Sequence, residues 1–239
     1  IFNQEQYCTE QESVKSDVLF VSHLTHSKQI SKNSDAYYGD LPDQLLEYGV
    51  SCSVALINHV KVSNQRVLNG RIRGKISRFL LSSSLDFLSE VKLYHTHRRS
   101  KKQLKFILKD LQVNKTIAKD VLNHHLSPGT FNTLRIAKQV AEIVNKTGVK
   151  FIITTYEGYA WEGLVYYYAR KANPDIKCFG YQHSAVFEHQ HAIKRSLSEG
   201  YNPDVILTSG LIAKDIFEKS ELKASKIVCL GSMKHPISN

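Results

Sequence analysis

The sequence lacks the features that mark membrane-spanning or disulfide-rich proteins. No apolar run approaches the roughly 18 to 20 residues that cross a bilayer, and the start has neither a basic segment nor a long apolar one. The four cysteines (Cys8, Cys52, Cys178 and Cys229) form no CxxC pair and have no histidine at zinc-ligand spacing, which favours free thiols in a reducing cytoplasm. The sole methionine is Met233, so we expect the chain to begin inside a longer polypeptide.

Several catalytic signatures are also missing. The sequence contains no GxSxG, no P-loop, no HExxH and no GxGxxG after the first strand-like run, which argues against the chemistries that those motifs carry. Positive charge, by contrast, is plentiful: the net charge is +10 and the pI is about 9.3. This excess indicates an anionic partner, without choosing between nucleic acid, an acidic lipid surface and a phosphorylated or carboxylated sugar. The basic residues cluster at 66–78 and 98–109, where solvated loop and helix faces are the alternative explanation.

Short apolar runs alternate with segments of helical periodicity along most of the chain. Strands are predicted at 17–23, 52–58, 151–155, 176–181, 205–208 and 226–231, and helices at 41–48, 117–126, 131–147, 161–172 and 211–219. Residues 24–40 and 61–75 are predicted to be loops, 76–88 a helix or an apolar loop, and 92–97 a short strand that enters a basic helix ending near 111. The alternation predicts an α/β protein with a Rossmann-like parallel sheet flanked by helices.

Polar residues follow three of these strands where each strand ends. They are Tyr156-Glu157-Gly158, Gln182-His183-Ser184 and Ser209-Gly210, and His23 ends the first strand in the same way. Ligands of open parallel sheets bind beyond the carboxyl ends of the strands. The sequence therefore predicts a site along one rim of the sheet.

Glu157 is the favoured catalytic residue. A carboxylate next to bound substrate can act as a general base towards a hydroxyl, and Gly158 can permit close approach of a ligand. Alternatively, Glu157 is an acid that interacts with the dipole of the following helix. Glu162, on that helix, can be the base, bind substrate or be a surface charge.

The segment after the second of these strands is rich in hydrogen-bonding groups. Gln182, His183, Ser184, His189, Gln190 and His191 would suit a sugar ring or a phosphate, with His183 as a second catalytic group, although loop capping is an alternative. A metal site is less favoured, because apart from Glu188 these histidines have no acidic or cysteine partner at a familiar spacing. Lys194 and Arg195, at the start of the next helical stretch, could bind phosphate or carboxylate.

Six runs of the sequence share one resemblance. They are DVLFVSH and YYGDLPDQLLEYG near the start, and TYEGYAWEGLVYYYAR, GYQHSAVFEHQHAIKRSL, YNPDVILTSG and KIVCLGS further along. Together they resemble bacterial capsule and lipopolysaccharide glycosyltransferases of the GT-B architecture. The resemblance covers about two thirds of the chain. The pairs Glu157-Gly158 and His235-Pro236 are also similar to motifs of Kdo transferases and sialyltransferases, in which the acid is the base and the His-Pro pair contacts the CMP part of the donor.

The resemblance implies a domain plan and an activity. Residues 17–210 would be the acceptor-side domain, and 211–239 the last helix and strand before an interdomain linker, with the donor domain absent or incomplete. Residues 1–16 are predicted to be a linker or frayed terminus because they are polar and without a periodic pattern. The activity would be sugar transfer from a nucleotide-linked donor, for example a CMP-linked one, to a lipid-linked or oligosaccharide acceptor. The reaction would need neither cofactor nor metal and would take place in the bacterial cytoplasm. Basic loops would hold the protein at the anionic inner membrane, and nucleic acid would not be a partner. A polyol-phosphate transferase of the CDP-glycerol type, or a non-catalytic glycan- or nucleic-acid-binding module, are the competing interpretations.

Overall fold

Seven parallel strands form one sheet in the computed structural model, which describes residues 15–26, 29, 34–60, 76–125, 127–187, 189–220 and 222–233. The strand order is β3-β2-β1-β4-β5-β6-β7. The strands are β1 (Val18–Leu24), β2 (Cys52–Asn58), β3 (Ser77–Leu81), β4 (Phe151–Thr155), β5 (Lys177–Gln182), β6 (Val205–Thr208) and β7 (Lys226–Cys229). The predicted Rossmann-like fold class is confirmed, because helices flank this parallel sheet and the chain reverses its direction of growth between β1 and β4.

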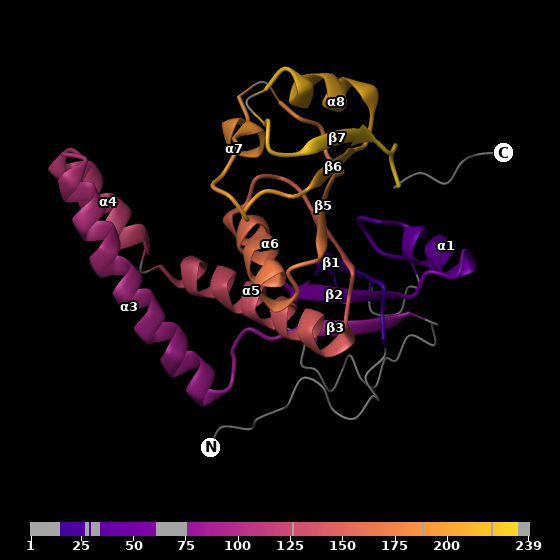
Figure 1. Cartoon of the computed structure of the whole chain (residues 1–239), viewed down its shortest axis with the longest axis horizontal. Coiled ribbons are helices and arrows are strands. Elements are labelled where there is room, and N and C mark those ends of the chain that lie inside the picture. Colours follow the sequence, from indigo (N-terminus) through magenta and orange to yellow (C-terminus); the bar gives the residue numbers. More distant parts are fainter. Residues whose placement is uncertain are drawn as a thin grey trace.

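Helices cover both faces of the sheet, as Figure 1 shows. They are α1 (Leu41–Glu47), α3 (Phe87–Asp110), α4 (Lys115–His125), α5 (Pro128–Thr147), α6 (Ala160–Ala172), α7 (His191–Lys194) and α8 (Leu211–Glu218). Alternate residues of β1 point to opposite faces, so Leu19 and Val21 pack with α5 and α6, whereas Val18 and Phe20 pack in the core that α1 covers. Because both faces are buried, the first four residues of β1, Val18 to Val21, form an unbroken apolar run.

Two sequence predictions for the middle of the chain are wrong. Residues 77–81 form the edge strand β3 rather than a helix or loop, since they pair in register with β2 from Ser53 opposite Ser77 to Ile57 opposite Leu81. Residues 92–97 are helical rather than extended, because α3 runs unbroken for 24 residues from Phe87. The Asp86 carboxylate caps this helix by accepting a hydrogen bond from the backbone N–H of Ser89.

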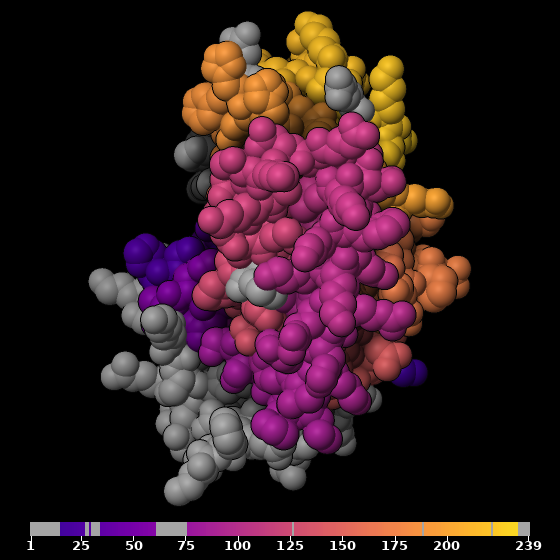
Figure 2. Space-filling model, turned by 90° about the vertical axis from the view of Figure 1, so that its left-hand side faces the viewer, coloured from indigo at the N-terminus to yellow at the C-terminus, as the bar shows by residue number. Residues whose placement is uncertain are grey.

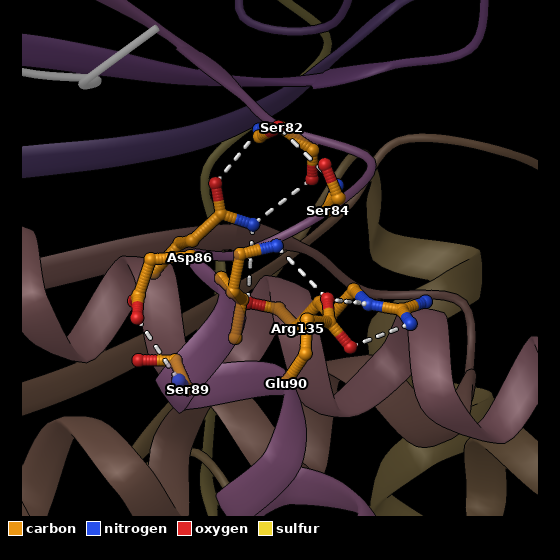
Figure 3. A network of polar contacts seen from close by, with 8 residues as sticks. Ser82, Ser84, Asp86, Ser89, Glu90 and Arg135 are labelled. Atoms are coloured by element: carbon orange, nitrogen blue, oxygen red, sulfur yellow. Dashed lines mark hydrogen bonds and ion pairs between the residues drawn. The ribbon is translucent and has the colours of Figure 1, made fainter. Parts of the chain in front are cut away.

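A polar network fastens the start of α3 to α5 (Figure 3). Arg135 donates from Nε and Nη2 to the two carboxylate oxygens of Glu90, at 2.6 and 2.8 Å, and Glu90 also accepts from the backbone of Leu85. Gln139 accepts from the backbone N–H of Ser82 and donates to its carbonyl. Beyond this anchor, α3 and α4 form an antiparallel hairpin that extends away from the sheet (Figure 1).

Candidate functional site

The candidate site lies at the carboxyl ends of β1, β2, β4 and β5, on both sides of the point where the strand order reverses. Here the loops after neighbouring strands leave in different directions and open a crevice. The polar clusters that follow β4, β5 and β6 lie at the same edge of the sheet, as predicted. Their chemical roles remain predictions.

Glu157 and His183 face each other across the ends of β4 and β5. The Nε2 atom of His183 lies 3.1 Å from Oε1 of Glu157. The imidazole side chain is only 4% exposed, while the Glu157 side chain is 29% exposed. Tyr37 stacks on the His183 ring with 4.7 Å between ring centroids. This arrangement places a carboxylate open to solvent beside an imidazole that is held on one face by an aromatic ring.

His23 joins the ends of three strands. Its Nδ1 lies 2.9 Å from Nε2 of His59, which follows β2, and its Nε2 lies 3.0 Å from Oγ1 of Thr155, which ends β4. The Trp161 ring meets the His23 ring edge-on. Burial, reinforced by the neighbouring His59 and His183, lowers the pKa of His23 to about 4. His23 is therefore a neutral imidazole at neutral pH, one ring nitrogen donating and the other accepting.

Tyr37, His59 and Trp161 complete this cluster and were not among the predicted site residues. Tyr37 is positioned by an Asx-type turn: the Asp35 carboxylate accepts from the hydroxyl of Ser22 and from the backbone N–H groups of Tyr37 and Tyr38. Burial, with the Glu157 charge nearby, raises the pKa of Tyr37. The signal that could have found His59 was its position directly after a buried strand, the same position that singled out His183.

Glu162 is buried rather than a surface charge, and that alternative is wrong. It is 1% exposed and its two carboxylate oxygens accept from the backbone N–H groups of Glu157, Gly158 and Tyr159 at 2.8, 2.9 and 3.0 Å. Burial raises the pKa of Glu162 to about 8, although these three donors oppose the shift. The geometry makes Glu162 a group that shapes the loop carrying Glu157.

Gly158 lies directly against α7. It has a positive φ of 84°, and the backbone of Ala192 and Ile193 occupies the space where a side chain would project. The close approach that this glycine permits in the structure is therefore that of α7.

Gln182 links two strands beneath the rim. It is fully buried, and its Oε1 lies 3.2 Å from the Ser209 hydroxyl and 3.3 Å from the Ser209 backbone nitrogen, both of which can donate to it. Its Nε2 atom has no hydrogen-bond partner among the described residues. The three predicted clusters are thus joined in pairs, Glu157 to His183 and Gln182 to Ser209.

An open cavity of about 460 Å³ adjoins Glu157, a volume within the usual range for small-molecule sites. Its lining comes from the loop after β4, from the segment between β5 and α7, and from α7 itself: Glu157, Tyr159, Ser184, His189, Gln190, His191, Ala192 and Ile193. Ser184 and His191 therefore lie where a ligand could reach them. Lys194 ends α7 and Arg195 follows it, so they stand at the end of this short helix rather than at its start, beyond the residues that line the cavity.

Some predicted residues cannot be placed. His235, Pro236 and Glu188 lie outside the described residues, as do residues 61–75, which hold most of the first basic cluster. Within the described part of the chain, no group of three or more His, Cys, Asp or Glu side chains is arranged to hold a metal ion.

Comparisons with known proteins add a structural neighbour. No family model matches this chain, and no curated protein matches its sequence. Among solved structures, UDP-GlcNAc 2-epimerase from Methanocaldococcus jannaschii is similar over 90% of this chain and 45% of its own, with 10% identity and a TM-score of 0.47. The chain thus spans less than half of that protein. A likeness at this level carries no functional argument, and the fold class rests on the sheet itself.

Proposed function

We propose that this chain is the acceptor-side domain of a GT-B glycosyltransferase that uses a nucleotide-activated sugar. The observation that carries the proposal is the Glu157–His183 pair, 3.1 Å apart, in which Glu157 lines a cavity of about 460 Å³ beside the strand-order reversal. The sequence resemblance to capsule and lipopolysaccharide transferases supports the same assignment through the runs that contain Glu157 and His183.

The pair would act as a general base towards an acceptor hydroxyl. Glu157 takes the hydroxyl proton as the acceptor oxygen bonds to the anomeric carbon, and His183 holds the carboxylate in position. The bond between that carbon and the donor phosphate breaks, and the phosphate leaves with the electron pair.

The cavity would hold the acceptor. Its hydroxyl, amide and imidazole groups, from Ser184, Gln190, His189 and His191, can exchange hydrogen bonds with sugar hydroxyls, and the Tyr159 ring offers an apolar face. The donor nucleotide would come from a second domain outside these residues. We therefore expect this chain alone to fold and to turn over slowly or not at all.

The test uses the complete polypeptide with CMP-, UDP-, GDP- and CDP-linked donors. A donor that binds the folded state raises its melting temperature. With that donor, Glu157→Gln should lower the transfer rate about 100-fold while the donor-induced thermal shift persists. The matched control is Glu199→Gln, an exposed carboxylate away from the cavity lining, which should leave both unchanged.

Other outcomes would identify the competing functions. Stabilisation by CDP-glycerol but by no nucleotide sugar would indicate polyol-phosphate transfer. Glycan binding that survives Glu157→Gln, with no transfer of any donor group, would indicate a binding module and contradict the proposed base.

A further inference from the structure

The α3–α4 hairpin leaves several large apolar side chains exposed to solvent. In α3 only Leu93 and His97 are buried, and in α4 no described residue is. The exposed fraction is 63% for Phe87, 48% for Tyr94 and 71% for Phe106. Contiguous exposed apolar surface on a single chain marks an interaction site.

Apolar and basic side chains share one side of α3. Phe87, Val91 and Tyr94 are followed at helical spacing by Arg98, Lys102 and Lys105, and all six are exposed. At 100° per residue they fall within about a third of the helix circumference, to one side of the buried Leu93 and His97. Phe106 flanks this stripe, next to a surface hollow lined by Lys102, Gln103, Phe106 and Ile107. Figure 2 shows α3, in magenta, lying along the face of the molecule turned towards the viewer.

The hairpin also holds most of the excess charge. Residues 87–125 contain nine Lys or Arg and three Asp or Glu, a net +6 out of the chain's +10. One of the three acids, Glu90, is already bound by Arg135. A partner for this surface must therefore be anionic. A second copy of the hairpin is disfavoured, since it would bring two net charges of +6 together.

We propose that the α3–α4 hairpin docks on the surface of an anionic lipid bilayer, lying in the interface without spanning it. Basic side chains beside Phe, Tyr and Val on one helix face match the two demands of that surface, attraction to acidic headgroups and burial of apolar groups at the acyl boundary. A nucleic-acid backbone would use the charges but would not bury the exposed apolar side chains of Phe87 and Val91. The described helices include none long and apolar enough to cross a membrane. This docking does not depend on the proposed transfer reaction.

The proposal moves the predicted membrane contact from basic loops to a helix. The basic cluster at 98–109 lies within α3, where the fixed helical spacing presents its charges with the aromatic rings.

The test is sedimentation of the full chain with vesicles of phosphatidylglycerol and phosphatidylcholine in equal parts, and with phosphatidylcholine alone. Binding should occur only to the anionic vesicles and weaken with salt. The triple variant Arg98→Gln, Lys102→Gln, Lys105→Gln should partition about 100-fold more weakly, at about 1 kcal/mol for each basic residue. The control Lys177→Gln, Lys223→Gln, Lys226→Gln removes the same charge from exposed positions away from the hairpin and should bind as the wild type does.

A second pair of variants tests the apolar contribution. Tyr94→Ser with Phe106→Ser should weaken binding to anionic vesicles at least 10-fold. Tyr48→Ser with Phe187→Ser, which removes two aromatic rings that are 86% and 65% exposed elsewhere, should not. Because all these side chains lie on the surface, circular dichroism should show unchanged helix content.

Four results would overturn the proposal. The first is absence of vesicle binding, and the second is an equal loss of binding in the hairpin and control variants. The third is tight binding of a single-stranded polynucleotide that the triple hairpin variant abolishes, without vesicle binding. The fourth is a dimer in analytical ultracentrifugation that Tyr94→Ser with Phe106→Ser dissociates while vesicle binding is unchanged.

Discussion

Gly158 and Ile193 touch so closely that a Cβ on Gly158 would lie 2.5 Å from the Ile193 backbone nitrogen. Side chains essentially never come that near to backbone atoms, and the Gly158 φ of 84° disfavours any other residue. One glycine thus fixes the distance between the loop that carries Glu157 and the helix that lines the cavity.

Replacing Gly158 with alanine should destabilise the fold and disturb the cavity. We expect the free energy of unfolding to fall by about 3 kcal/mol or more, because backbone strain and a backbone clash add together. Gly49→Ala is the matched control: Gly49 has a φ of 78° and nothing within 4 Å of the position that a Cβ would occupy, so it should cost about 1 kcal/mol. Denaturant unfolding measures both, and equal losses would contradict the contact.

Glu162 should make the fold less stable as pH rises. Its pKa is about 8 in the folded chain against an ordinary value of 4.5, so the folded state holds its proton longer than the unfolded state does. The stabilisation is present below pH 4.5 and lost as pH rises through about 8. Urea unfolding between about pH 5 and pH 9 should show this slope, and Glu162→Gln, which stays neutral, should flatten it. The variant will itself be less stable, because both side-chain oxygens of Glu162 accept backbone N–H groups and Gln replaces one of them with an NH2 group, which cannot accept.

His23 should have the opposite effect in acid. Its pKa is lowered from 6.5 to about 4, so the unfolded chain binds a proton first as pH falls. The stability that a neutral His23 contributes is complete above pH 6.5 and is lost as pH falls through about 4, a change of up to about 3 kcal/mol. An NMR titration of the ring should give its midpoint directly. His26→Gln is the control, because His26 is exposed and should leave the acid limb unchanged whereas His23→Gln reduces it. A His23 midpoint near 6.5 would contradict the buried cluster.

The Arg135–Glu90 pair should anchor the hairpin. Arg135→Met removes two charge-assisted hydrogen bonds from a carboxylate that is 27% exposed, and we expect a loss of about 1 to 2 kcal/mol. Faster amide hydrogen exchange in the first turns of α3 would locate the effect. The control Lys146→Met breaks an exposed pair with Glu142 within α5 and should cost less than about 0.5 kcal/mol. Equal losses of unfolding free energy in the two variants would contradict the conclusion that the Arg135–Glu90 pair anchors the hairpin.

The strands of the candidate site could be predicted because each is a short apolar run ending in polar residues. The predicted strand at 205–208 has the bounds of β6, and that at 151–155 the bounds of β4. Parallel pairing then brings Glu157 and His183 together, since residues that follow neighbouring parallel strands emerge at the same edge. The edge strand β3 could not be predicted in this way, because only one of its first three residues, Phe79, is apolar and its pairing with β2 is what makes it extended.

The contacts between residues of the site could not be predicted from the sequence. His23 contacts Thr155 across 132 residues of chain, and Tyr37 stacks on His183 across a similar separation. No local pattern encodes such contacts. The burial of Glu162 could not be predicted for a related reason. The sequence places Glu162 on the helix, but only the tertiary structure shows the loop that folds back over it and removes it from water.

The sequence by itself determined the α/β class, most strands and the rim where polar residues gather, because hydrophobic periodicity is a local property that burial on a sheet imposes. Only the tertiary structure decided which of those residues meet, which are withdrawn into the core, and which helix faces remain uncovered. Those outcomes depend on crossover direction and backbone packing between segments far apart in the chain, where a single close contact such as that of Gly158 with Ile193 sets the geometry.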